Sequence, residues 1–232
     1  MSMKFIRENP KILRAWIDGN KELYEEYLAA NPSSLFPAFL KEIRDAGIEF
    51  EVGEQILDYM PERKKDIVPI AMNYWILSKA SRNEEEERHF LQFFNYEGLD
   101  EVVQLLLDRF CSDDTSELTR ELIAECLYTI RSKEYLKEYS YIITQPSFGK
   151  HRRLIILLLG ELKSTTAIPD LVKLLEDETV RTHTIAALSE FEREDFRPLF
   201  ERYKDAEHPG WRKYSREAIA QLDKLKNKQA NE

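Results

Sequence analysis

Four segments in the second half of the chain share one pattern of apolar and polar positions. They align without gaps, and apolar residues recur in each at spacings of three and four, the periodicity of an amphipathic α-helix. The segments are Leu118 to Ile130, Lys150 to Leu162, Thr179 to Phe191 and Gly210 to Leu222. The alignment predicts four helices that bury equivalent faces and recur at a repeat-protein interval.

An arginine occupies the same position in all four segments. Successive arginines are 32, 29 and 31 residues apart, and the positions six, seven and ten after each are apolar. The arginines are Arg120, Arg152, Arg181 and Arg212. The apolar positions are Cys126, Leu127, Ile130, Leu158, Leu159, Leu162, Ala187, Leu188, Phe191, Ala218, Ile219 and Leu222. These twelve residues are expected to be buried.

A further helical pattern precedes each of the four segments, so each repeat is predicted to be a helix, a short turn and a second helix. The preceding helices are expected over 99–110, 133–144, 167–176 and 195–204, and residues 66–79 and 84–96 form a plausible fifth repeat. We therefore expect one continuous solenoid domain, with an irregular helical N-terminal cap over 1–62, repeats over 63–226 and a disordered tail over 227–232.

The pattern resembles HEAT repeats, in particular the short HEAT-like repeats associated with lyases. In one repeat the matching residues are Ile168-Pro169, Asp177 and Val180-Arg181. The resemblance implies an all-α fold, a right-handed α-α superhelix of about five helical hairpins. It also implies that each aligned arginine ties the start of its helix to a neighbouring turn, and that the second helices line a concave face that commonly binds partners.

Composition and charge agree with a soluble helical protein and disfavour nucleic acid as a ligand. The chain has only seven Gly and nine Pro, while 43% of its residues are hydrophobic. Residues 1–144 carry a charge of −10 and residues 145–232 a charge of +1. An acidic first half repels phosphate backbones, which leaves a basic protein partner or a merely soluble surface as the interpretations.

The sequence also bears on the compartment. Charges at Lys4, Arg7 and Glu8 interrupt the apolar stretch that a signal peptide needs, and the longest uncharged apolar run, Leu154 to Gly160, is far too short for a membrane span. Cys111 and Cys126 are the only cysteines and are expected to be free thiols in a reducing environment. We expect a cytoplasmic protein that does not bind a membrane; its oligomeric state is left open.

No catalytic, metal or cofactor site is predicted. The four histidines, His89, His151, His183 and His208, lack a second ligand at helical spacing. The run Glu84 to Glu87 is interpreted as the solvated start of a helix, and the aromatic residues over 74–96 as core packing, not a ligand cage. A basic groove built from the aligned arginines is the alternative to their structural role.

The most plausible binding surface lies one and five positions after each aligned arginine. It is predicted to consist of Arg153, Leu157, Thr182, Ala186 and Lys213, with Glu121, Glu125 and Glu217 around an apolar centre. This is the composition of a modest protein interface. In the alternative interpretation, these residues are packed between repeats.

Three functions are compatible with the pattern. The first is a non-enzymatic protein-binding module: an adaptor, regulator or inhibitor. The second is a helical-repeat DNA glycosylase, to which Trp211, Arg152, Arg153 and Lys213 would contribute, with Asp177 or Glu178 nearby. The third is a repeat protein related to tetrapyrrole lyases, which the repeat type alone suggests. The absence of catalytic motifs and the net acidity favour the first.

Overall fold

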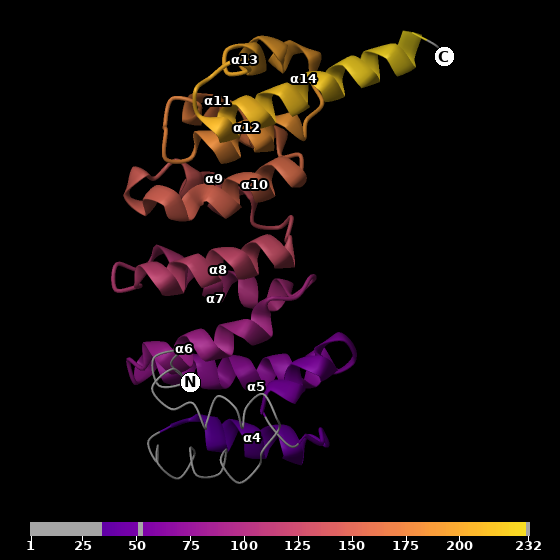
Figure 1. Ribbon diagram of the computed structural model, residues 1–232. Coiled ribbons are helices and arrows are strands. Elements are labelled where there is room, and N and C mark those ends of the chain that lie inside the picture. Colours follow the sequence, from indigo (N-terminus) through magenta and orange to yellow (C-terminus); the bar gives the residue numbers. More distant parts are fainter. Residues whose placement is uncertain (1–33, 51–52, 231–232) are drawn as a thin grey trace. The chain divides into compact units, whose positions relative to one another are not determined.

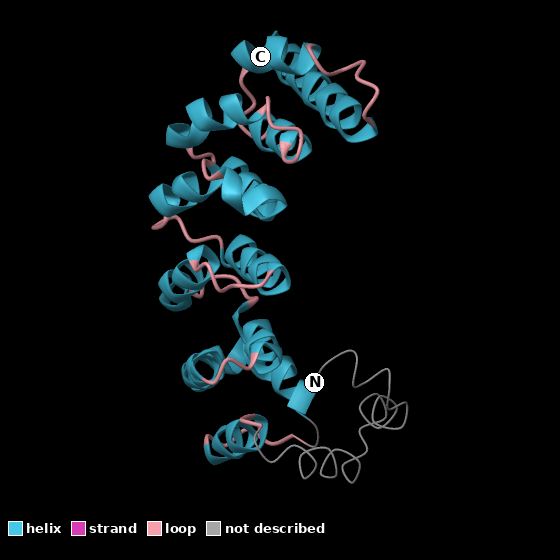
Figure 2. Cartoon of the chain, turned by 90° about the vertical axis from the view of Figure 1, so that its left-hand side faces the viewer, coloured by secondary structure: helices cyan, strands magenta, loops and turns pink. Residues whose placement is uncertain are grey.

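A computed structural model describes residues 34–50 and 53–230, which form two compact units. Unit 1 ends at Tyr96 and unit 2 begins at Glu97. Every regular element in these ranges is a helix, and they contain no strand (Figure 2). The fold is all-α, as the sequence predicts. Most of the predicted cap lies outside the described residues.

The described part of unit 1 contains three α-helices and two short 3₁₀ segments. They are α4 (Phe36–Asp45), η1 (Gly53–Tyr59), α5 (Met60–Ala80), α6 (Glu84–Leu91) and η2 (Gln92–Phe94). Helix α5 packs against both α4 and α6, and the pair α5–α6 is the helical hairpin expected over 66–96. The repeats are expected to start at residue 63. This residue, Arg63, lies inside α5 and has non-helical backbone angles.

The aromatic side chains of unit 1 pack against one another. Phe39 and Phe90 are fully buried with ring centroids 5.2 Å apart, and Phe39 also lies 5.6 Å from the ring of Tyr74 and 5.1 Å from that of Phe93. Such edge-on and tilted contacts are typical of a hydrophobic core. The cluster therefore fills the space between α4, α5 and α6.

The interpretation of Glu84 to Glu87 as a solvated helix start is wrong for two of its residues. Glu87 is buried, and the Oε1 atom of Glu86 accepts hydrogen bonds from the backbone N–H of Leu35, 2.7 Å away, and from Ser34. The amide of Leu35 precedes α4 and has no partner within that helix, so Glu86 supplies one. This contact joins residues 51 apart, which a local pattern cannot anticipate.

Unit 2 contains four helical hairpins in succession (Figure 1). The first hairpin is α7 (Asp100–Cys111) with α8 (Glu117–Ile130), and the second is α9 (Leu136–Ile143) with η3 (Pro146–Arg152) and α10 (Arg153–Glu161). The third is η4 (Thr165–Ala167) and α11 (Ile168–Leu174) with α12 (Arg181–Ser189), and the fourth is η5 (Glu194–Phe196) and α13 (Arg197–Glu201) with α14 (Pro209–Ala230).

The second helices of consecutive hairpins stack on each other, which makes unit 2 solenoid-like. Helix α10 contacts α8 on one side and α12 on the other, and α12 contacts α14. Figure 2 shows the first and second helices of unit 2 as two rows. Nine of the twelve aligned apolar residues are buried, whereas Leu162, Phe191 and Ile219 are half-buried. Leu162 and Phe191 follow the last residues of α10 and α12, and Ile219 lies on the last helix, so each has fewer neighbours to cover it.

The C-terminal end of the repeats differs from the prediction. Helix α14 continues to Ala230, so residues 227–230 are helical where a disordered tail is expected. The segment after Leu222 contains neither Gly nor Pro, and three of its ten residues are Lys, which is a good helix former in water.

Helices α10 and α12 approach each other closely at Gly160. A Cβ atom added there would lie 2.6 Å from both the Cα and the carbonyl oxygen of Ala187, which are backbone atoms that cannot rotate away. We expect Gly160→Ala to lower the free energy of unfolding by about 1–3 kcal/mol, since the two helices would have to separate. Urea denaturation measures this. Gly47→Ala has open space around the added atom but a positive φ, so its cost would come from backbone strain alone.

Candidate functional site

Each of the four aligned arginines binds carbonyl oxygens at the end of the first helix of its hairpin or in the turn that follows it. Arg152 is 2% exposed, and its guanidinium donates to the carbonyl oxygens of Ile143 at 3.1 Å and Gly149 at 3.0 Å. It also donates to Asp177 Oδ2 at 2.6 Å. Asp177 belongs to the next repeat, so this ion pair links two hairpins through a partly buried, charge-assisted hydrogen bond.

The other three arginines make equivalent contacts within their own hairpins. Arg120 donates to the carbonyls of Phe110 and Ser112, Arg181 to those of Leu175 and Glu176, and Arg212 to those of Ala206 and Glu207. The last carbonyls of a helix have no partner in the helix itself, and a planar guanidinium can serve two of them together. The contacts favour a structural role over a phosphate-binding one.

Of the residues that a DNA glycosylase would use, Lys213 is exposed, whereas four others make contacts within unit 2. Arg152 is buried, Arg153 donates to Glu121 Oε1 at 2.7 Å, and Asp177 accepts from Arg152 and Thr179. The Trp211 ring lies 4.2 Å beneath the guanidinium of Arg181. Arg152 and Arg153 are therefore paired within the chain, and the Arg181 guanidinium already lies over the Trp211 ring, where a flipped base would have to stack.

The predicted partner surface lies on α10, α12 and α14, but its residues differ in exposure. Arg153, Leu157, Thr182 and Ala186 are half-buried, while Lys213 is exposed. The side chain of Thr182 lies close to Gly210, where an added Cβ would be 2.9 Å from its Cγ2, so it also packs between α12 and α14. The charged residues Glu125 and Glu217 are exposed at the two ends of the surface.

Leu118 is an apolar residue of this surface that the alignment did not single out. It lies at the start of α8 and is 57% exposed. The aligned positions in the other repeats are Lys150, Thr179 and Gly210, so an apolar residue there is a departure from the pattern. We call Leu118, Arg153, Leu157, Ala186 and Lys213, together with Glu125 and Glu217, the second-helix surface.

Comparison with known protein families agrees with the hairpin geometry. Residues 141–229, which run from the end of α9 into α14, match the family model of HEAT repeats. This part of the chain is a HEAT-repeat array. Neither the curated proteins nor the solved structures compared with the chain gave a match. No helix in the described part of the chain is long and apolar enough to cross a membrane.

Two histidines at the contacts between repeats have a pKa below the ordinary value. Burial lowers the pKa of His183, as does the neighbouring positive charge of Arg153. Burial also lowers the pKa of His151, although Glu121 lies 3.3 Å from its Nδ1 atom and opposes the shift. In the described residues no group of three or more His, Cys, Asp or Glu side chains is arranged to hold a metal ion.

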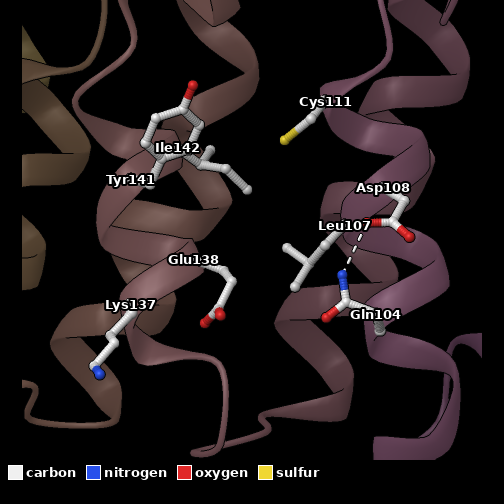
Figure 3. A pocket seen from close by; sticks show the side chains of 8 residues that line it. All are labelled: Gln104, Leu107, Asp108, Cys111, Lys137, Glu138, Tyr141 and Ile142. Carbon is white, nitrogen blue, oxygen red and sulfur yellow. Dashed lines mark hydrogen bonds between the residues drawn. The ribbon is translucent and has the colours of Figure 1, made fainter.

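A groove of about 310 Å³ lies between the first helices α7 and α9, before most of the HEAT match (Figure 3). It is lined by Gln104, Leu107, Asp108, Cys111, Lys137, Glu138, Tyr141 and Ile142. Leu107 and Ile142 are buried beneath it, whereas Tyr141 is 58% exposed. The sequence pattern does not predict this groove, because its residues come from helices more than twenty residues apart.

The two cysteines are expected to react very differently with a disulfide reagent. Cys111 is exposed in the groove, whereas burial raises the pKa of Cys126 to about 12 and leaves its thiol protonated and inaccessible. Partial burial also raises the pKa of Cys111, so its thiolate fraction at pH 8 is lower than that of a free cysteine. We expect one thiol per folded chain to react, more slowly than glutathione and faster as the pH rises. Two fast thiols in the folded protein would contradict the burial of Cys126.

Proposed function

We propose that the protein is a non-catalytic protein-binding module, acting as an adaptor, regulator or inhibitor through its second-helix surface. HEAT repeats are commonly protein-interaction modules, which supports the general class. The observation that carries the specific proposal is the row of apolar side chains left open to solvent on stacked second helices. Leu118 is more than half exposed at the start of α8, and Leu157 and Ala186 are partly exposed at equivalent positions of α10 and α12.

The charges around this row suit a protein partner. Glu125, Lys213 and Glu217 are exposed near an apolar centre, so a partner could bury the centre while the charges stay at a solvated rim. The negative charge of the first half of the chain favours a basic partner. The two free thiols fit a reducing compartment, and we propose the cytoplasm.

The test is a binding measurement on charge-introducing variants. The partner is first isolated by affinity purification from a native extract and then titrated calorimetrically with the wild type, Leu118→Glu and Leu157→Glu. A carboxylate at the centre of an interface must be desolvated on binding, so each variant should weaken the affinity by about tenfold or more. Leu77→Glu is the matched control, because Leu77 is 49% exposed on α5, a helix that contributes no residue to the second-helix surface.

Melting temperatures separate binding from folding. Leu118→Glu should leave the melting temperature nearly unchanged, because its side chain is mostly solvated. A Leu157→Glu variant that first loses stability would show that Leu157 packs between repeats. If both glutamate variants are stable and bind at full strength, the interface lies elsewhere. If the protein retains DNA in a salt-dependent titration and no protein partner is found, the binding-module proposal is wrong.

A further inference from the structure

The groove between α7 and α9 combines an apolar floor with carboxylates at its rim. Leu107 and Ile142 form the floor, and Glu138 and Asp108 contribute carboxylates from the two facing helices. Figure 3 shows Glu138 directed into the space between the helices and Lys137 directed away from α7. The opening therefore presents negative charge above a hydrocarbon surface.

The carboxylates differ in how far their hydrogen-bonding capacity is used. Asp108 Oδ1 accepts from Gln104 Nε2 at 2.8 Å, which holds that carboxylate in place along α7. Glu138 makes no hydrogen bond or ion pair with any residue that the structure describes, and it is exposed. A carboxylate has about four acceptor positions, so both groups retain room for a donor from outside the chain.

Tyr141 adds a flat aromatic surface at the same opening. Its ring is exposed, although an aromatic side chain on a helix surface usually packs against neighbours. A guanidinium group can stack on such a ring and donate in its own plane to two carboxylates, which a lysine ammonium cannot do equally well. The aliphatic stem of an arginine would cover Leu107 and Ile142.

We propose that this groove takes an arginine side chain of a protein partner, with its guanidinium between Glu138 and Asp108 and against Tyr141. The surrounding charge supports a cationic occupant, since residues 97–144 contain eleven Asp and Glu against five Lys and Arg. The inference rests on the proposed function in one respect, namely that a protein supplies the arginine. It adds a site on the first helices to the second-helix surface.

Cys111 lines the groove and allows a direct test without the partner. The folded full-length protein is equilibrated with 2-mercaptoethanol and one of two disulfide probes that differ in a single group. One is N-(2-sulfanylethyl)-4-guanidinobutanamide, and the other is its neutral ureido analogue, both added as mixed disulfides with 2-mercaptoethanol. Mass spectrometry gives the reductant concentration at which half of Cys111 remains labelled, which reflects how strongly the tethered group binds the groove. Buried Cys126 provides the unlabelled background.

We expect the reductant concentration at half labelling to be about threefold higher for the guanidinium probe than for the ureido probe. A modest charge pair would stabilise the label by about this factor. Glu138→Gln should remove most of this preference. Glu207→Gln is the control, because Glu207 is an exposed glutamate in the turn before α14 and the substitution changes the net charge by the same amount. The melting temperature of both variants should match that of the wild type.

Two results would overturn the inference. One is equal retention of the two probes on the wild type, and the other is an equal loss of preference in Glu138→Gln and Glu207→Gln, which would show long-range attraction to an acidic protein. Neither result bears on the second-helix surface, which is tested by Leu118→Glu with the partner. A failure of that separate experiment likewise leaves the probe result intact, so the two proposals can fail independently.

Discussion

Leu159→Ala is expected to lower the free energy of unfolding by about 2–5 kcal/mol, as large-to-small changes in a packed core do. Leu159 is fully buried on α10, which contacts α8 on one side and α12 on the other. The substitution removes three carbon atoms from a helix packed between two others, and α8 and α12 cannot move in to fill the space without disturbing the stack. Urea denaturation followed by circular dichroism measures the loss.

The matched control is Leu118→Ala, the same substitution at an exposed position. Leu118 is 57% exposed, so we expect a change within about 0.5 kcal/mol. A loss below about 0.5 kcal/mol for Leu159→Ala as well would mean that the alignment of the repeats is wrong by at least one position.

Arg152→Ala is expected to lower the free energy of unfolding by about 3 kcal/mol. This is the lower end of the range for breaking a buried ion pair, because Asp177 is partly open to water. The change leaves the carbonyl oxygens of Ile143 and Gly149 without their donor and removes the partner of Asp177 in the next repeat. Arg153→Ala, one position later, removes a partly exposed pair with Glu121 and should cost at most about 1 kcal/mol.

The pH dependence of this difference provides an independent check. Burial tends to raise the pKa of Asp177, but hydrogen bonds from Thr179 and Arg152 outweigh it, and the pKa lies below its ordinary value. A depressed carboxyl pKa stabilises the fold above the unfolded-state pKa, and this contribution is lost as the pH falls through the folded-state value. The difference in the free energy of unfolding between the wild type and Arg152→Ala should therefore become smaller as the pH falls. A constant gap would mean that Arg152 acts through its carbonyl contacts alone.

The sequence by itself determined the class of fold and the positions of most hairpins in unit 2. Amphipathic periodicity can be read from the sequence because it depends only on the spacing of nearby residues. The same spacing recurs four times, in register with the aligned arginines Arg120, Arg152, Arg181 and Arg212. Burial of Leu127, Leu159 and Leu188 followed from the same stripe, because a helix in a stack has one face toward its own hairpin and others toward its neighbours.

Tertiary structure alone decided which residues are left at the surface. The pairing of Arg152 with Asp177, the capping of Leu35 by Glu86 and the groove between α7 and α9 join residues far apart in the chain. Helical spacing specifies which face of a helix is apolar, but not how far a neighbouring helix covers it. For this reason the pattern could not separate exposed Leu118 from half-buried Leu157, and only the packing of consecutive hairpins distinguishes them.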